Sequence, residues 1–197
     1  ISYPYAVISD IHIHDWSAFA HTLSSGENSR LRITLNAIQE VATNLRSNGG
    51  NDIIISGDLF HTRGKLKPTV LNPVFDFFRD LCSQGYRIWS IPGNHDLENK
   101  YSDDIGDAMH VFRSIPGFRH FTKPTMIGDI IFLPWIEDKE EFIKTIDAWR
   151  LRDLSDKTLI CHIGIDGVLD NVKGKIGKEV LDKGFKYVFA GDYHNHR

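Results

Sequence analysis

Five short apolar runs in this chain are each followed within three residues by an aspartate, an asparagine or a histidine. The runs have the composition of buried strands and lie at residues 5–9, 52–56, 87–91, 158–161 and 187–190. Segments with helical spacing of apolar residues separate the first three runs, one at 29–46 and one that begins at Pro68. This alternation predicts a mostly parallel sheet covered by helices. Because ligands bind beyond the carboxyl ends of such strands, the polar residues should meet at one rim.

The middle of the chain departs from this rhythm and predicts shorter strands. These strand-like segments follow one another closely at 118–121, 125–127 and 130–133. Gly128-Asp129 is a candidate hairpin turn, and a helix is predicted at 137–149. The sequence shows no linker, repeat or low-complexity stretch, so residues 1–197 are predicted to form a single domain. A chain of this length can bury about 70% of its unfolded surface.

The residues that follow the five strands share one property, which is that each can bind a cation. They are Asp10 and His12, then Asp58 and His61, then Asn94, His95 and Asp96, then His162, and lastly Asp192 and His194. Taken singly, an aspartate at a strand end is usually a cap or turn residue, and a lone histidine is usually a hydrogen-bonded core residue. Together, carboxylates and imidazoles on one rim without a cation would leave charge buried and unpaired, which is costly. A metal centre removes that cost.

The types of donor narrow the choice of metal. Cys82 and Cys161 are the two cysteines of the sequence, so we expect no disulfide framework, no Cys-rich zinc site and a reducing compartment. Carboxylate, imidazole and amide ligands suit Mn, Fe, Zn or Mg. About seven ligands exceed what one ion accepts but fit two ions that share a carboxylate, an arrangement that clamps a phosphoryl group for in-line displacement. The net charge of −3 agrees with this, since bound cations would then attract phosphate.

Taken in order, these residues resemble the five signature blocks of the calcineurin-like metallophosphoesterase superfamily. The blocks are Asp10-x-His12, Gly57-Asp58-x-x-His61, Gly93-Asn94-His95-Asp96, His162 and Gly191-Asp192-x-His194. Within the superfamily the chain is most similar to DNA-repair nucleases of the SbcD and Mre type, in segments 8–12, 57–63 and 91–96. His61 is part of this likeness, because phosphatases of the superfamily usually have Asp there. The resemblance implies a four-layer α-β-β-α metallophosphoesterase sandwich, an α/β fold with mixed sheets flanked by helices.

The resemblance also implies a role for each matched residue. One divalent ion would be held by Asp10, His12 and His194, the other by Asn94, His162 and Asp192, and Asp58 would bridge both. His95 would be the catalytic acid that protonates the leaving oxygen, and Asp96 would orient it. The substrate phosphate would be contacted by His61, which also positions it for catalysis, and by Asn94 and Arg63. The implied reaction is attack of a metal-bridging hydroxide on a DNA phosphodiester, as in an exo/endonuclease of DNA repair or recombination.

The last block departs from the family pattern, which is Gly-His-x-His. Here a carboxylate, Asp192, stands where the family has the first histidine. A carboxylate makes the site harder and lowers its net positive charge, so we expect Mn²⁺ first, with Mg²⁺, Fe²⁺ and Zn²⁺ as the other candidates. An alternative register pairs His194 with His196 instead.

The resemblance further implies partners. These are DNA, as single strands or duplex ends, a second copy of the chain in a homodimer, and a coiled-coil ATPase subunit of the SbcC/Rad type. No membrane partner is expected, and the expected location is cytoplasmic, or the host cytoplasm for a viral protein. Family members continue beyond the last block, so we expect the chain to be the catalytic core of a longer protein.

Three interpretations remain open from the sequence. The chain is a DNA phosphodiesterase, a phosphoesterase of small substrates such as cyclic nucleotides or phosphoproteins, or a non-catalytic scaffold with the same fold. The long loop from Ile13 to Asn28, which contains Trp16 and Phe19, either folds against the surface or stacks on DNA bases.

Overall fold

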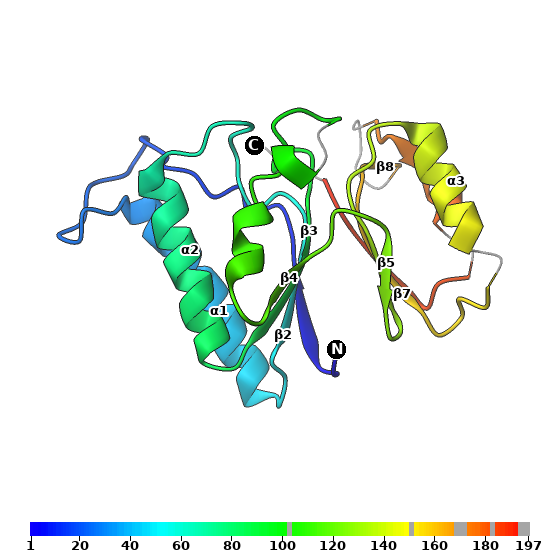
Figure 1. Cartoon of the computed structure of the whole chain (residues 1–197), viewed down its shortest axis with the longest axis horizontal. Coiled ribbons are helices and arrows are strands. Elements are labelled where there is room, and N and C mark those ends of the chain that lie inside the picture. The colour runs from blue at the N-terminus through cyan, green and yellow to red at the C-terminus, as the bar shows by residue number, and fades with distance from the viewer. Residues whose placement is uncertain (102–103, 150–151, 168–172, 182–183, 193–197) are drawn as a thin grey trace.

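The computed structural model describes residues 1–101, 104–149, 152–167, 173–181 and 184–192, and it contains two four-stranded sheets (Figure 1). The first sheet is parallel throughout and runs in the order β1 (Tyr5–Ile8), β2 (Asp52–Ser56), β3 (Arg87–Ile91) and β4 (Phe118–His120). The second runs in the order β10 (Tyr187–Gly191), β7 (Thr158–His162), β6 (Ile130–Leu133) and β5 (Thr125–Ile127). Its β5 and β6 are antiparallel and join at the predicted turn, where Gly128 has a φ of +63°. The second sheet is therefore mixed.

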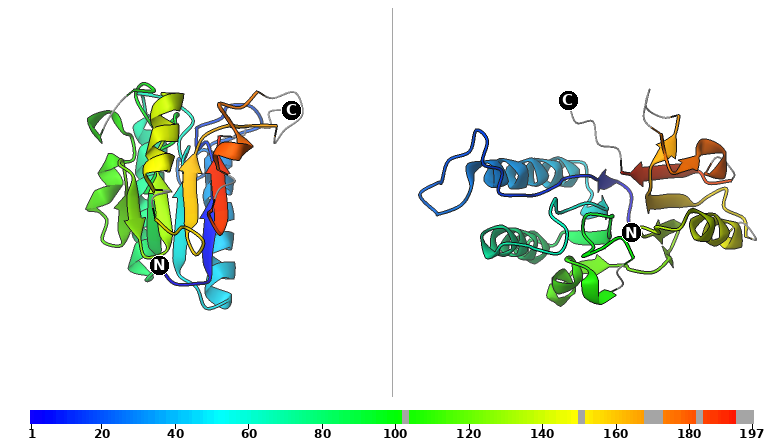
Figure 2. Two further views of the ribbon diagram at one scale, coloured as in Figure 1. Left: turned by 90° about the vertical axis from the view of Figure 1, so that its right-hand side faces the viewer. Right: turned by 90° about the horizontal axis from the view of Figure 1, so that it is seen from above.

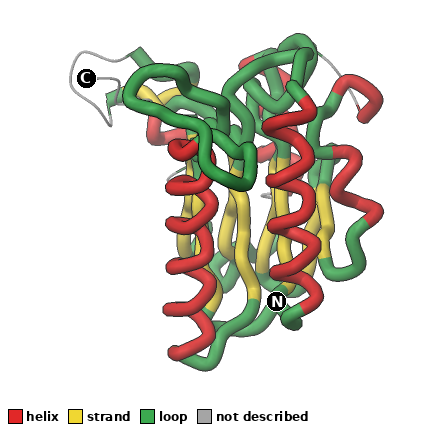
Figure 3. The backbone as a smooth tube through the Cα atoms, turned by 90° about the vertical axis from the view of Figure 1, so that its left-hand side faces the viewer, coloured by secondary structure: helices red, strands yellow, loops and turns green. Residues whose placement is uncertain are grey.

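Two long helices cover the outer face of the first sheet, and one shorter helix covers the second (Figures 1 and 3). They are α1 (Ser29–Ser47), α2 (Pro68–Ser83) and α3 (Lys139–Trp149). Helix α1 starts where the side-chain oxygen of Asn28 accepts hydrogen bonds from the backbone N–H groups of Arg30 and Leu31, at 2.9 and 3.1 Å. Helix α3 starts two residues later than predicted, and the Asp138 side chain accepts from the N–H of Glu141 at 2.8 Å.

Three apolar clusters lie between these layers. The clusters of the outer layers lie between α1, α2 and the first sheet, and between α3 and the second sheet. The central cluster joins the two sheets through Ile54, Trp89, Ile91, Ile130, Phe132 and Ile160. Each such side chain, when fully buried, contributes roughly 1.5–3 kcal/mol relative to exposure. The four-layer α-β-β-α sandwich is thereby confirmed, and Figure 2 shows the layers from above.

The loops that follow the parallel strands gather at one end of the sheets, at the top of Figure 3. The N-terminus lies at the opposite end (Figure 1). A small parallel pair, β8 (Ile165–Asp166) and β9 (Ile176–Gly177), was not predicted because two residues carry no periodicity. Three short 3₁₀ helices were also missed, at Asp104–Gly106, His110–Ser114 and Lys178–Val180. No helix in the part of the chain described here is both long and apolar enough to cross a membrane.

Candidate metal centre

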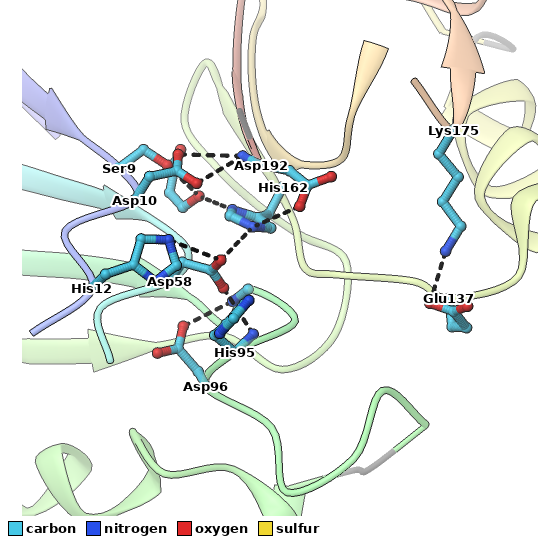
Figure 4. Close-up of polar contacts among 12 residues, drawn as sticks. Ser9, Asp10, His12, Asp58, His95, Asp96, Glu137, His162, Lys175 and Asp192 are labelled. Carbon is cyan, nitrogen blue, oxygen red and sulfur yellow. Dashed lines mark hydrogen bonds and ion pairs between the residues drawn. The ribbon is translucent and has the colours of Figure 1, made fainter. Parts of the chain in front are cut away.

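Asp58 lies at the middle of the rim, in the turn that follows β2. Its carboxylate is fully buried, and one oxygen, Oδ1, accepts a hydrogen bond from the backbone N–H of His95 at 2.9 Å. The other oxygen, Oδ2, faces two imidazoles, at 3.6 Å from His12 Nε2 and 3.4 Å from His162 Nε2 (Figure 4). One carboxylate is thus placed between donors that come from strands of different sheets.

Asp10 and His12 reach this rim through an unusual backbone. Their φ angles are +52° and +48°, in the left-handed region that costs non-glycine residues about 1–3 kcal/mol each. Hydrogen bonds hold this conformation, from Asp10 N to the Gly57 carbonyl at 3.2 Å and from His12 N to the Asp58 carbonyl at 3.0 Å. Asp58 itself has a φ of +53°. Strain concentrated in three acidic and imidazole residues at one rim is typical of a functional site.

The second sheet supplies His162 and Asp192, each fixed by a neighbour across the rim. The Nδ1 of His162 donates to the Ser56 carbonyl oxygen at 2.8 Å, which turns Nε2 toward Asp58. The backbone N–H of Asp192 donates to both carboxylate oxygens of Asp10, at 3.1 and 3.2 Å. The Asp192 carboxylate lies 3.8 Å from His162 Nε2. These contacts hold together the two halves of the molecule at the rim, as Figure 4 shows.

Glycines allow this close approach. A Cβ on Gly57 would stand 2.3 Å from His162 Nδ1, and Gly57 has a φ of +93°. A Cβ on Gly93 would stand 2.1 Å from Asp58 Oδ1. Any side chain at either position would push a candidate ligand out of place.

The electrostatics of the rim favour positive charge. Burial would raise the pKa of Asp58, but the facing His162, together with His95, holds that pKa below its usual value. Burial would lower the pKa of His162, but Asp58, together with the charge of Asp10, raises it to about 9. Both shifts come from the attraction between the Asp58 carboxylate and the facing imidazole, which shows that a cation at this position is stabilised by the carboxylates around it.

Asp96 organises the backbone around the site. Its buried carboxylate accepts hydrogen bonds from the N–H groups of Phe60 and Gly93, both at 2.9 Å, and of Leu59 at 3.4 Å. Burial, and next the charge of Asp58, raise the pKa of Asp96 to about 7. These bonds tie the turn after β2 to the turn after β3.

A family model of calcineurin-like phosphoesterases matches residues 3–196. The chain belongs to the calcineurin-like phosphoesterase family. Among solved structures the chain is similar to the nuclease MPE of Pseudomonas putida, at 18% identity and a TM-score of 0.45. That match covers 86% of this chain and 66% of the nuclease chain. No curated protein sequence matches the chain.

The family is one of metal-dependent hydrolases, and the donors of this phosphoesterase fit divalent metal ions. Within the described residues, two groups of three side chains bring possible ligand atoms within 4.8 Å of one another. They are Asp10, Asp58 and His162, and His12, His61 and His95. The side-chain oxygen of Asn94 is buried and has no hydrogen-bond partner among the described residues. A buried amide oxygen in that condition suits a cation ligand.

The structure places most of the predicted site residues on this phosphoesterase rim. It groups His12 with His61 and His95, whereas the sequence paired His12 with Asp10, so the assignment of ligands to individual ions stays a prediction. Arg63 is exposed in the loop beyond His61. The predicted ligand His194, and His196 of the alternative register, lie outside the described residues.

One predicted helper, Asp96, acts differently from expectation. Asp96 was expected to orient His95, yet its carboxylate accepts hydrogen bonds from backbone N–H groups. The bond that orients His95 runs instead from its Nδ1 to the carbonyl oxygen of His61, at 2.7 Å. A backbone carbonyl is present at every residue, so no sequence signal marks this partner.

Sequence reasoning also passed over Trp135 and His120. Trp135 follows β6, two residues beyond its end, and its ring lies 6.1 Å from that of His162. An indole is neither an acid nor a base, so it gives no signal for a site, although Trp135 follows its strand just as the predicted site residues follow theirs. His120 ends β4 and pairs with the buried Asp107 at 2.5 Å.

Proposed function

We propose that the chain is a two-metal phosphodiesterase that hydrolyses DNA phosphodiester bonds. The observation that carries the proposal is the buried Asp58 carboxylate, whose Oδ2 lies 3.6 Å from His12 and 3.4 Å from His162. A single carboxylate between donors of two sheets has the position of a bridging ligand. The membership of a phosphoesterase family supports phosphoryl chemistry at that position.

Each ligand in the proposal keeps the role that its position suits. Asp10, His12, Asn94, His162, Asp192 and His194 would hold the ions, and Asp58 would bridge them. When bound, the two ions bind phosphate and supply a water of lowered pKa. Nδ1 of His95 donates to the His61 carbonyl, so the proton for the leaving oxygen must be carried on Nε2. His61 and Arg63, with Asn94, would hold the phosphate.

Mn²⁺ is the proposed metal. Asp192 adds a third carboxylate to Asp10 and Asp58, and a harder, less positive site favours Mn²⁺ or Mg²⁺ over Zn²⁺. The Asp192 carboxylate already lies on the rim, 3.8 Å from His162.

DNA is proposed as the substrate because the block from Gly57 to His61 resembles that of the SbcD and Mre type. By the same resemblance we propose that the chain acts in the cytoplasm as a homodimer, with a coiled-coil ATPase subunit of the SbcC/Rad type. A scaffold would need neither the strained backbone of Asp10 and His12 nor the buried oxygen of Asn94, which has no partner among the residues described. These features favour an enzyme.

The test is cleavage of a labelled single-stranded oligonucleotide with Mn²⁺, Mg²⁺ or EDTA. We compare the native chain with Asp58→Asn and His95→Ala, and with Asp76→Asn as a matched control, since Asp76 is exposed on α2 and pairs with Arg79. Mn²⁺-dependent cleavage that both site variants lose and the control keeps is the expected result. Turnover of an aryl phosphodiester without cleavage of the oligonucleotide would indicate that the substrate is a small phosphodiester and not DNA. Folded protein inactive on both would favour the scaffold.

A further inference from the structure

The loop between β1 and α1 brings an indole against the candidate catalytic histidines. The ring of Trp16 lies 4.5 Å from that of His61 and 4.9 Å from that of His14, measured between centroids. The His61 ring in turn stacks on His95, at 5.7 Å and an interplanar angle of 23°. The rings of Trp16, His61 and His95 therefore form a row of neighbouring rings that runs from the loop into the rim.

The loop is held in this position by polar contacts from three elements. The side chain of Asn28, which caps α1, donates to the carbonyl oxygen of Trp16 at 2.9 Å. The ammonium of Lys67 lies 2.7 Å from the carboxylate of Asp15. The His14 ring is hydrogen-bonded to the hydroxyl of Thr62 at 3.1 Å. Trp16 is thus presented at a defined place, while the loop beyond it projects past α1 and α2 (Figure 2).

The guanidinium of Arg30 also lies near Trp16, but it is not packed closely against the indole. The Arg30 guanidinium lies 5.6 Å from the centre of the indole, whereas Arg46 packs on Tyr86 at 4.1 Å in the same molecule. Arg30 donates an exposed hydrogen bond to the Ala18 carbonyl at 3.1 Å. The Arg30 side chain is half-buried, but the hydrogen bond of its guanidinium is exposed to solvent, so the guanidinium can turn to a phosphate at little cost. The half-buried indole and this cation together present the two groups that bind single-stranded nucleic acid, a stacking ring and a phosphate contact.

We infer that Trp16 is a substrate-binding residue that stacks on the base of a nucleotide next to the scissile phosphate, with Arg30 on a neighbouring phosphate. The inference rests on the proposed function, because it needs a polynucleotide at the rim. The position is the reason for choosing a flanking base: Trp16 contacts His61, which is the residue proposed to hold the scissile phosphate. A base of the same nucleotide, or of its neighbour, would therefore lie against the Trp16 indole.

The competing role is that Trp16 only holds the ring of His61 in place. In that role its loss would slow every substrate alike, through kcat. Base stacking instead predicts that the loss depends on whether a base is present at one position of the substrate. The two roles therefore separate in a cycle that removes the indole and the base singly and together.

The experiment uses single-stranded oligonucleotides that are intact or lack one base, at each position around the cut. Native chain, Trp16→Ala, Trp16→Phe and, as a control, Tyr3→Ala are compared with Mn²⁺, after circular dichroism shows that each is folded. Tyr3 is 89% exposed and lies near the N-terminus, at the end of the sheets opposite the rim.

We expect Trp16→Ala to raise KM for the intact oligonucleotide about tenfold or more, and Trp16→Phe to recover most of that loss. For the native chain, one missing base next to the cut should raise KM by a similar factor, and in Trp16→Ala that same missing base should cost nothing further. Equal losses on every substrate, or no loss, would overturn the inference while leaving the nuclease intact. A native chain that cleaves no oligonucleotide would overturn the proposed function itself.

Discussion

Replacing Gly93 by alanine tests how tightly the bridging carboxylate must be placed. The new Cβ would stand 2.1 Å from Asp58 Oδ1 and 2.5 Å from the Asp58 backbone nitrogen. Ordinary contact begins at 3.4 Å, so the carboxylate oxygen must recede by about 1.3 Å. Neither neighbour is the flexible end of a long side chain, because one is backbone and the other is a buried, hydrogen-bonded carboxylate.

A displacement of this size should cost far more in catalysis than in stability. Overpacking of a buried position costs roughly 1–3 kcal/mol of unfolding free energy. Misplacement of a reacting group by about 1 Å can cost roughly a hundredfold in rate. We therefore expect Gly93→Ala to remain folded at 25 °C, to lower kcat with Mn²⁺ about a hundredfold, and to weaken Mn²⁺ binding.

The assay is Mn²⁺-dependent cleavage at saturating metal, alongside unfolding by urea. Gly85→Ala is the control, because a Cβ there meets nothing within 4 Å although its φ of +89° adds backbone strain. The control should lose stability and keep its kcat. If Gly93→Ala kept native kcat and native affinity for Mn²⁺, Asp58 would not be the ligand on which the chemistry depends.

Three further predictions concern other parts of the chain. Despite burial, the Asp52 carboxyl has a lowered pKa because Arg87 donates to it at 2.6 and 2.7 Å. Its contribution to the free energy of unfolding is therefore complete above pH 3.8 and is lost as pH falls through the folded pKa, which urea unfolding of the native chain should show. Asp52→Asn should abolish this pH dependence and lower the free energy of unfolding by roughly 2 kcal/mol near neutral pH. Asp192→His should shift metal preference from Mn²⁺ toward Zn²⁺ in competition titrations, and an unchanged preference would refute the role given to that carboxylate. Burial raises the pKa of the Cys161 thiol to about 12, so alkylation at pH 8 should occur only after unfolding, and rapid labelling of folded protein would contradict the buried position.

The starts of the helices and the ends of the strands were predictable because both carry strong residue signals. Helices α1 and α2 begin where Ser29 and Pro68 were expected, since a cap and a proline mark their first turns. The strands end beside the predicted residues because the apolar runs stop where the polar residues begin. The division into two sheets had no such signal, because a strand buried on both faces has the same apolar composition in either sheet.

Contacts made by backbone groups and by loops were not predictable. The Ser56 and His61 carbonyls that orient His162 and His95 have no residue-specific signature. The sequence left open whether the loop that contains Trp16 folds against the surface or stacks on DNA bases. Only the path of that loop in the structure brings Trp16 onto His61. Asp96 was a candidate because of its position in a motif, but its role depends on which N–H groups surround it.

The most direct test of the two-metal account is the number of Mn²⁺ ions bound per chain, measured by calorimetric titration of metal-free protein. The account predicts two ions for the native chain and fewer for Asp58→Asn, because the bridging carboxylate contributes to both sites. A native chain that binds none or one, or an Asp58→Asn variant that binds two with native affinity, would contradict it.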